Sequence, residues 1–185
     1  MRIGFDNDKY QKIQSEHIKE RISQFDGKLY LELGGKLFDD HHASRVLPGF
    51  LPDSKLRMFQ KISDSIEIVI VISATDIEKN KTRADLGITY DEDVIRLRSE
   101  FQNRGFMVGS VVITHYNGQP AAAAFRQRLE RDGIKTYCHY LIDGYPHDVK
   151  LIASDDGFGK NDFVETTRPL VIVTAPGPGS GKMAV

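Results

Sequence analysis

Cysteine, long apolar runs and excess charge are all scarce in this 185-residue chain. Cys138 is the single cysteine, so no internal disulfide can form. No stretch approaches the roughly 18 apolar residues of a membrane span, and the first residues lack the apolar core of a signal peptide. The 25 basic and 26 acidic side chains nearly cancel, so no general attraction to polyanions arises. We therefore expect a cytoplasmic protein that binds neither membranes nor nucleic acids.

The composition is that of an ordinary globular protein. Hydrophobic residues make up 40% of the chain and charged residues 28%. This length and composition predict one domain over residues 1–185. Cys138 falls in the apolar segment 134–142, where a buried, inert thiol is expected and not a nucleophile.

Helical and strand patterns alternate along the sequence. Apolar residues at helical spacing, a Thr89–Glu92 capping box and a proline at a helix start, Pro120, predict helices. The predicted helices cover residues 8–24, 53–62, 89–105, 120–133 and 149–153. The predicted strands cover residues 29–33, 66–72, 108–114, 134–142 and 170–174. The alternation predicts an α/β fold: a doubly wound, mostly parallel sheet of about five strands with helices on both faces.

A glycine-rich segment directly follows the last predicted strand. Residues 175–182 read Ala-Pro-Gly-Pro-Gly-Ser-Gly-Lys. Successive glycines let backbone N–H groups turn toward one anion, and a lysine at a helix start adds positive charge. Only three residues follow Lys182, too few for a stable helix. We therefore predict a P-loop-like, phosphate-binding loop in what looks like the N-terminal fragment of a longer protein.

The glycine segment matches only half of the P-loop pattern. Gly181 and Lys182 fit, whereas Pro176 stands at the first glycine position and Met183 at the hydroxyl position. Methionine does not ligate Mg²⁺, which prefers oxygen ligands. The sequence therefore favours binding of a nucleotide or phosphate and does not favour Mg²⁺-dependent hydrolysis. The dinucleotide pattern G-x-G-x-x-G also fails, because its last glycine falls on Lys182.

Other polar residues follow the predicted strands. Ligands of open α/β sheets bind beyond the carboxyl ends of the strands, so these loops join the candidate site. The predicted ligand-binding residues are Gly177, Gly179, Ser180, Gly181, Lys182, Thr174, Lys36, Asp76 and His115.

Metal and serine-hydrolase motifs find little support. The run 39–42, Asp-Asp-His-His, contains metal-binding side chains, but adjacent residues rarely point at one ion. No zinc-protease H-E-x-x-H helix occurs, and Ser180 does not lie in a G-x-S-x-G elbow. We therefore predict no metal site, and these motifs assign no catalytic residue.

Several segments together resemble one known family. They read KLYLELGGKLFDDHHASRVLPGF, ISATDIEKNKTRADLGITYDEDVIRL, SVVITHYNGQPAAAAF, GYPHDV and ETTRPLVIVTAPGPGSGK. They closely resemble the bacterial domain-of-unknown-function family numbered eighteen forty-six, over essentially the whole chain. The resemblance implies a longer protein with a largely separate C-terminal region and no established activity. For that full-length form we expect a homo-oligomer.

Two functions follow from these observations and stay open at this point. In the first, the chain is part of an enzyme that acts on a phosphorylated ligand. Lys182 and the loop amides would stabilise negative charge, and His115 or Asp76 would serve as acid or base. Alternatively, it is a non-catalytic binding or assembly module whose glycine segment is a structural turn.

Overall fold

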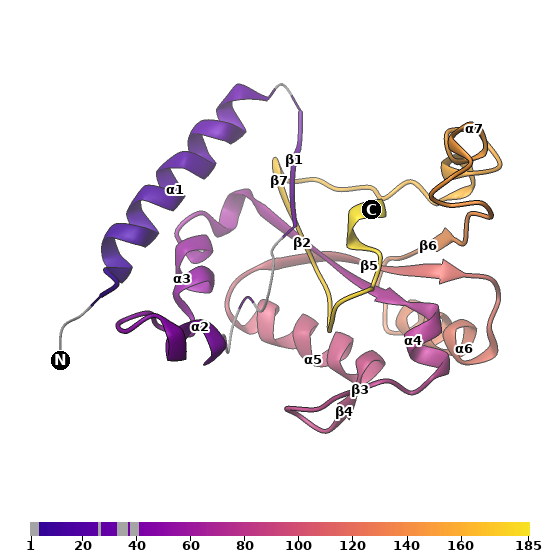
Figure 1. Cartoon of the computed structure of the whole chain (residues 1–185), viewed down its shortest axis with the longest axis horizontal. Coiled ribbons are helices and arrows are strands. Elements are labelled where there is room, and N and C mark those ends of the chain that lie inside the picture. The colour runs from indigo at the N-terminus through magenta and orange to yellow at the C-terminus, as the bar shows by residue number, and fades with distance from the viewer. Residues whose placement is uncertain (1–3, 26, 33–36, 38–40) are drawn as a thin grey trace.

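Five parallel strands form the central sheet of the computed structural model, which describes residues 4–25, 27–32, 37 and 41–185 (Figure 1). Their order across the sheet is β1-β7-β2-β5-β6. The strands are β1 (Leu29–Glu32), β2 (Ile66–Ser73), β5 (Met107–Tyr116), β6 (Thr136–Tyr140) and β7 (Leu170–Thr174). All five predicted strands, and the parallel α/β sheet, are confirmed.

Helices connect the strands, and the predicted ones are present. They are α1 (Asn7–Gln24), α3 (Ser54–Gln60), α5 (Tyr90–Asn103), α6 (Pro120–Arg131) and α7 (Val149–Ile152). The sequence patterns missed two short helices, α2 (His41–Val46) and α4 (Ala74–Glu78), and a small hairpin, β3 (Thr82–Arg83) with β4 (Ile88–Thr89). These pieces are shorter than the windows over which periodicity is measurable. No helix in the described ranges is long and apolar enough to cross a membrane.

One face of the sheet carries the large apolar core. Strand β2 is buried along its whole length, and its four isoleucines enter this core together with residues of α3, α4, α5 and α6. Phe59, Phe101 and Leu129 are its largest helical contributions, each at most 1% exposed. From α1, Ile18 and Ile22 pack against the same cluster.

The opposite face is covered differently. Val69, Val71, Val112, Val171 and Val173 form a second cluster with Val164, a loop residue. Tyr137, Ala175 and Val185 pack against this cluster, and no residue of α1–α7 belongs to it. The predicted doubly wound arrangement, with helices on both faces, is therefore wrong for the described residues. The connection from β6 back to β7 contains only α7 and a 3₁₀ turn, η2 (Phe158–Lys160), so no long helix reaches this face.

The glycine segment leaves the sheet from β7, which lies between the edge strand β1 and the central strand β2 (Figure 1). It ends in a 3₁₀ turn, η3 (Lys182–Ala184), which Gly181 precedes in a left-handed conformation with φ 79°. The predicted α-helix start at Lys182 is thus a 3₁₀ turn here. The likeness of this segment to a phosphate-binding P-loop stays a prediction.

Candidate functional site

An irregularity at the carboxyl end of β5 marks the candidate site. The pairing of β5 with β6 shifts register between Ile113 and Tyr116. Within this interruption His115 has a positive φ of 51°. Few residues other than glycine adopt this conformation. Bulges of this kind redirect side chains and are frequent beside active sites.

Three hydrogen bonds hold this irregular segment in place. His115 Nδ1 lies 3.0 Å from Ser73 Oγ, at the end of β2. Thr114 Oγ1 donates to Ser180 O in the glycine segment at 2.5 Å, and Gln119 Nε2 donates to His115 O at 2.8 Å. The local strain is therefore supported from β2, from the glycine segment and from the start of α6. Ser73 was not among the predicted ligand-binding residues, although it ends the buried strand just before Asp76.

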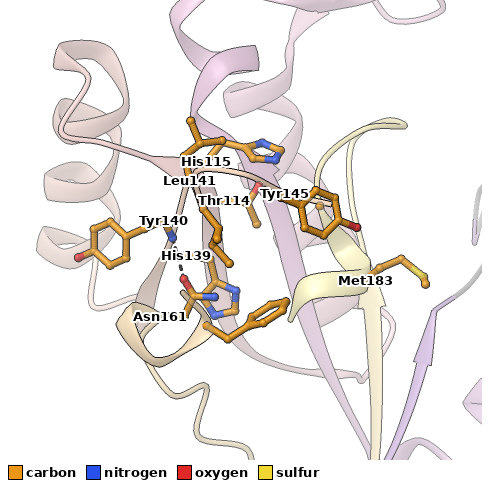
Figure 2. Close-up of a pocket in the computed structure, with 11 residues that line it drawn as sticks. Thr114, His115, His139, Tyr140, Leu141, Tyr145, Asn161 and Met183 are labelled. Atoms are coloured by element: carbon orange, nitrogen blue, oxygen red, sulfur yellow. Dashed lines mark hydrogen bonds between the residues drawn. The ribbon is translucent and has the colours of Figure 1, made fainter. Parts of the chain in front are cut away.

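A pocket of about 220 Å³ opens beside this segment (Figure 2). It lies at the carboxyl ends of β5 and β6 and at the end of the glycine segment. Its lining consists of Thr114, His115, His139, Tyr140, Leu141, Ile142, Tyr145, Phe158, Asn161, Gly181 and Met183. The structure thus brings two predicted site residues, His115 and Gly181, to one pocket.

The far wall of the pocket is built on the edge strand β6. Asn161 Oδ1 accepts a hydrogen bond from the Tyr140 N–H at 2.8 Å, drawn as a dashed line in Figure 2. Asp162 Oδ2 accepts from the Cys138 N–H at 2.7 Å, and the Asp162 N–H donates to Cys138 O. These bonds satisfy the exposed edge of β6, which would otherwise offer unpaired backbone groups. They also fix Asn161 at the pocket.

Close packing holds the glycine segment between α5 and β5. A Cβ atom added to Gly177 would lie 2.2 Å from Tyr90 Oη, and one added to Gly181 would lie 3.1 Å from Thr114 Oγ1. Gly179 meets no atom within 4 Å but has a positive φ of 76°. Tyr90 was not among the predicted site residues, because its spacing matches the core face of α5.

Several polar groups of the segment lack protein partners. The backbone N–H groups of Gly177, Gly179, Ser180 and Gly181 donate to no acceptor in the described part of the chain. Ser180 is only 3% exposed, yet its Oγ has no hydrogen-bond partner among the described residues. Buried hydroxyls without partners are uncommon in native proteins, so this one calls for an explanation.

Lys182 is engaged by a carboxylate. Its Nζ lies 3.6 Å from Glu32 Oε1 on β1, and its side chain is only 16% exposed. The ion pair joins η3 to the edge strand β1, the neighbour of β7 in the sheet. Lys182, at the end of the segment, therefore already has the carboxylate of Glu32 as its counter-charge.

Asp76 reaches the glycine segment through two other side chains. The residue is 9% exposed; its Oδ1 accepts from Lys81 Nζ at 3.1 Å, while its buried Oδ2 has no partner in the described ranges. Lys81 Nζ lies 5.0 Å from the ring centre of Tyr90, within the range of a cation–π contact. Tyr90 in turn contacts Gly177.

The remaining predictions have mixed outcomes. Thr174 is buried at the end of β7, beside Ile70 of β2. Lys36, Asp39 and Asp40 lie outside the described residues, as do the side chains of His41 and His42 in α2. Within the described ranges, no three His, Cys, Asp or Glu side chains gather as metal ligands do. Cys138 is buried as predicted, and burial raises the pKa of its thiol.

Comparison with known proteins assigns the chain to a family. The model of the N-terminal domain of unknown function DUF1846 matches residues 3–185. The chain belongs to this family. It is 57% identical over 182 residues to a UPF0371 protein of Streptococcus pyogenes serotype M5, covering 98% of this chain and 37% of the relative. A UPF0371 protein of Streptococcus sanguinis is 56% identical, with 99% and 37% covered. The chain thus spans little more than a third of the length of these curated relatives, and the family is uncharacterised.

Proposed function

We propose that this chain binds a phosphate-bearing ligand through its glycine segment, residues 175–182. The observation that carries the proposal is a set of donors in the segment that have no acceptor among the described residues: four backbone N–H groups and the buried Ser180 hydroxyl. Clustered backbone N–H groups form anion sites in other proteins, because their dipoles converge on one negative group. A phosphate supplies the acceptors that Ser180 lacks.

The surrounding charges favour the same ligand. Lys182 lies at the end of the segment and would move between Glu32 and a bound phosphate. Met183 is 89% exposed and its side chain carries no oxygen, so we do not expect this segment to hold Mg²⁺. His115 is the candidate acid–base group, because Ser73 engages Nδ1 and leaves Nε2 for a ligand.

One observation favours a second function, a binding or assembly module without a phosphate ligand. Gly177 and Gly181 each have a structural reason to be glycine: a Cβ at Gly177 would lie 2.2 Å from Tyr90 Oη, and Gly181 has a positive φ of 79° and lies close to Thr114. Packing alone would then explain the glycines. It would not explain the unpartnered Ser180 hydroxyl, which is why phosphate binding is preferred.

Replacement of Ser180 tests the proposal. We expect Ser180→Ala to weaken binding of pyrophosphate by about 1.5 to 3 kcal/mol, the usual contribution of a hydrogen bond to a charged group. The matched control is Ser110→Ala, because Ser110 is 1% exposed and its Oγ also lacks a partner, but it lies near the other end of β5. Isothermal titration calorimetry measures both. Equal affinities for the two variants would remove Ser180 from the site.

A backbone variant tests the amide groups separately. Gly179→Ala adds a Cβ into open space but disfavours φ +76°, so the N–H groups should rotate away from a common anion. Gly87→Ala carries the same backbone penalty at φ +68°, also in open space, in the β3–β4 hairpin. We expect both variants to lose about 1 kcal/mol of stability and only Gly179→Ala to lose pyrophosphate binding. If wild-type protein binds no pyrophosphate, the module function is the correct one.

A further inference from the structure

The pocket beside the glycine segment is too small for a whole ligand of ordinary size. Its volume is about 220 Å³, whereas sites that enclose a drug-sized ligand measure roughly 300 to 1,000 Å³. A pocket of this size holds one part of a ligand, such as a ring system. The rest of the ligand would lie outside it.

The pocket walls are suited to a flat, uncharged group. Tyr145, Phe158 and Leu141 line it and remain 67%, 43% and 60% exposed, so their apolar surface faces water when the pocket is empty. Figure 2 places Tyr145 and Met183 along one side of the pocket and His139 and Asn161 along another. Among the described residues that line it, two are histidines, His115 and His139, and none is Asp, Glu, Lys or Arg. Aromatic walls of this kind stack on planar rings.

A polar side chain of the pocket can form a hydrogen bond with the edge of such a ring. Asn161 Oδ1 is occupied by the Tyr140 N–H, which orients the amide and leaves its Nδ2 group to donate. A ring nitrogen or carbonyl oxygen would accept this bond. The pocket thus combines stacking surfaces with a fixed hydrogen-bond donor, as base-binding sites do.

Gly181 connects this pocket to the proposed phosphate site. It lines the pocket and also belongs to the segment whose N–H groups find no acceptor in the part of the chain that the structure describes. Thr114, another lining residue, is tied to Ser180 by a hydrogen bond of 2.5 Å. We propose that the ligand is a nucleotide, with its base in this pocket and its phosphate on the glycine segment. This inference rests on the proposed phosphate-binding function.

Titrations of the full-length protein with a graded set of probes test the inference. The probes are AMP, GMP, CMP and UMP, together with ribose 5-phosphate and adenosine. We expect at least one nucleotide to bind between about fivefold and 150-fold more tightly than ribose 5-phosphate, because one stacked base contributes that much. Tyr145→Ala should abolish this preference and leave the affinity for ribose 5-phosphate unchanged. Phe163→Ala is the matched control, since Phe163 is an aromatic residue that is 85% exposed and does not line this pocket.

The outcomes separate this inference from the proposed function. If ribose 5-phosphate binds as tightly as all four nucleotides, the base pocket is wrong and the phosphate site stands. If adenosine binds as tightly as AMP and Tyr145→Ala weakens both, the ring pocket stands and the phosphate site is wrong. If no probe binds, both are wrong.

Discussion

The two faces of the central sheet are both buried, but by different means. On the helix-covered face, the isoleucines of β2 meet large side chains from four helices. On the second face, valines meet one loop residue, Val164, together with Tyr137, Ala175 and Val185. Large apolar side chains near that second covering stay exposed, including Phe163 at 85% and Met183 at 89%. A sheet strand can therefore be fully buried without helices on both sides.

A buried carboxylate anchors the loop on the second face. Glu67 is only 2% exposed, and its Oε2 accepts hydrogen bonds from the N–H groups of Thr167 at 2.5 Å and Arg168 at 3.2 Å. Gly109 on β5 makes room for this side chain, since a Cβ there would lie 1.9 Å from Glu67 Oε1. The first face is thus held by apolar packing, whereas the second also depends on polar bonds to a loop. That difference makes the second face the easier one to disturb or rearrange.

Adjacent residues of β2 allow a direct test of this comparison. Ile70 faces the helices and Val71 faces the loop, and both are 0% exposed. We expect Ile70→Ala to lower the free energy of unfolding by about 2 to 5 kcal/mol, because rigid helices cannot fill the cavity. Val71→Ala should cost less, about 1 to 2.5 kcal/mol, since fewer atoms are removed and a loop can collapse onto the gap. Urea denaturation measures both, and a larger loss for Val71→Ala would contradict the comparison.

The polar anchor of the second face gives a smaller expected effect. Glu67→Gln keeps the shape of the side chain but removes the charge that strengthens the bonds to Thr167 and Arg168. We expect a loss of about 1 kcal/mol in the free energy of unfolding, because the amide oxygen of Gln still accepts these bonds but less strongly than a carboxylate. Glu165→Gln is the matched control, because Glu165 is 72% exposed and its pair with Lys135 spans 3.7 Å. Equal stability of the two variants would show that Glu67 does not anchor the loop.

The smallest expected effect concerns the single thiol. Burial raises the pKa of Cys138, so the folded protein holds this proton more tightly than the unfolded chain. Its contribution to stability is therefore complete below the unfolded pKa of about 8.5 and declines as the pH rises above it. We expect the free energy of unfolding to fall more between pH 8 and 10 in wild-type protein than in Cys138→Ala. Parallel pH profiles of the two proteins would contradict this.

Local patterns were sufficient to predict most elements and part of the site. The capping pair of Thr89 and Glu92 is present, with the Thr89 N–H donating to Glu92 Oε2 at 3.2 Å, and Pro120 begins α6. The prediction that His115 and the glycine segment meet at one edge also agrees with the structure. It succeeded because the carboxyl ends of parallel strands necessarily share an edge. The Ser73 contact and the Asn161 wall could not be predicted, since both depend on segments distant in the sequence.

Local periodicity and backbone freedom were enough to predict the strands of the central sheet, the longer helices, the burial of β2 and the glycine-rich end of β7. Only the tertiary structure decided which faces the helices cover, that β7 lies between β1 and β2, and that Lys182 meets Glu32. It also decided the left-handed backbone of His115. These features depend on pairing between distant segments. Hydrophobic periodicity indicates that a residue is buried but does not indicate which residues it packs against.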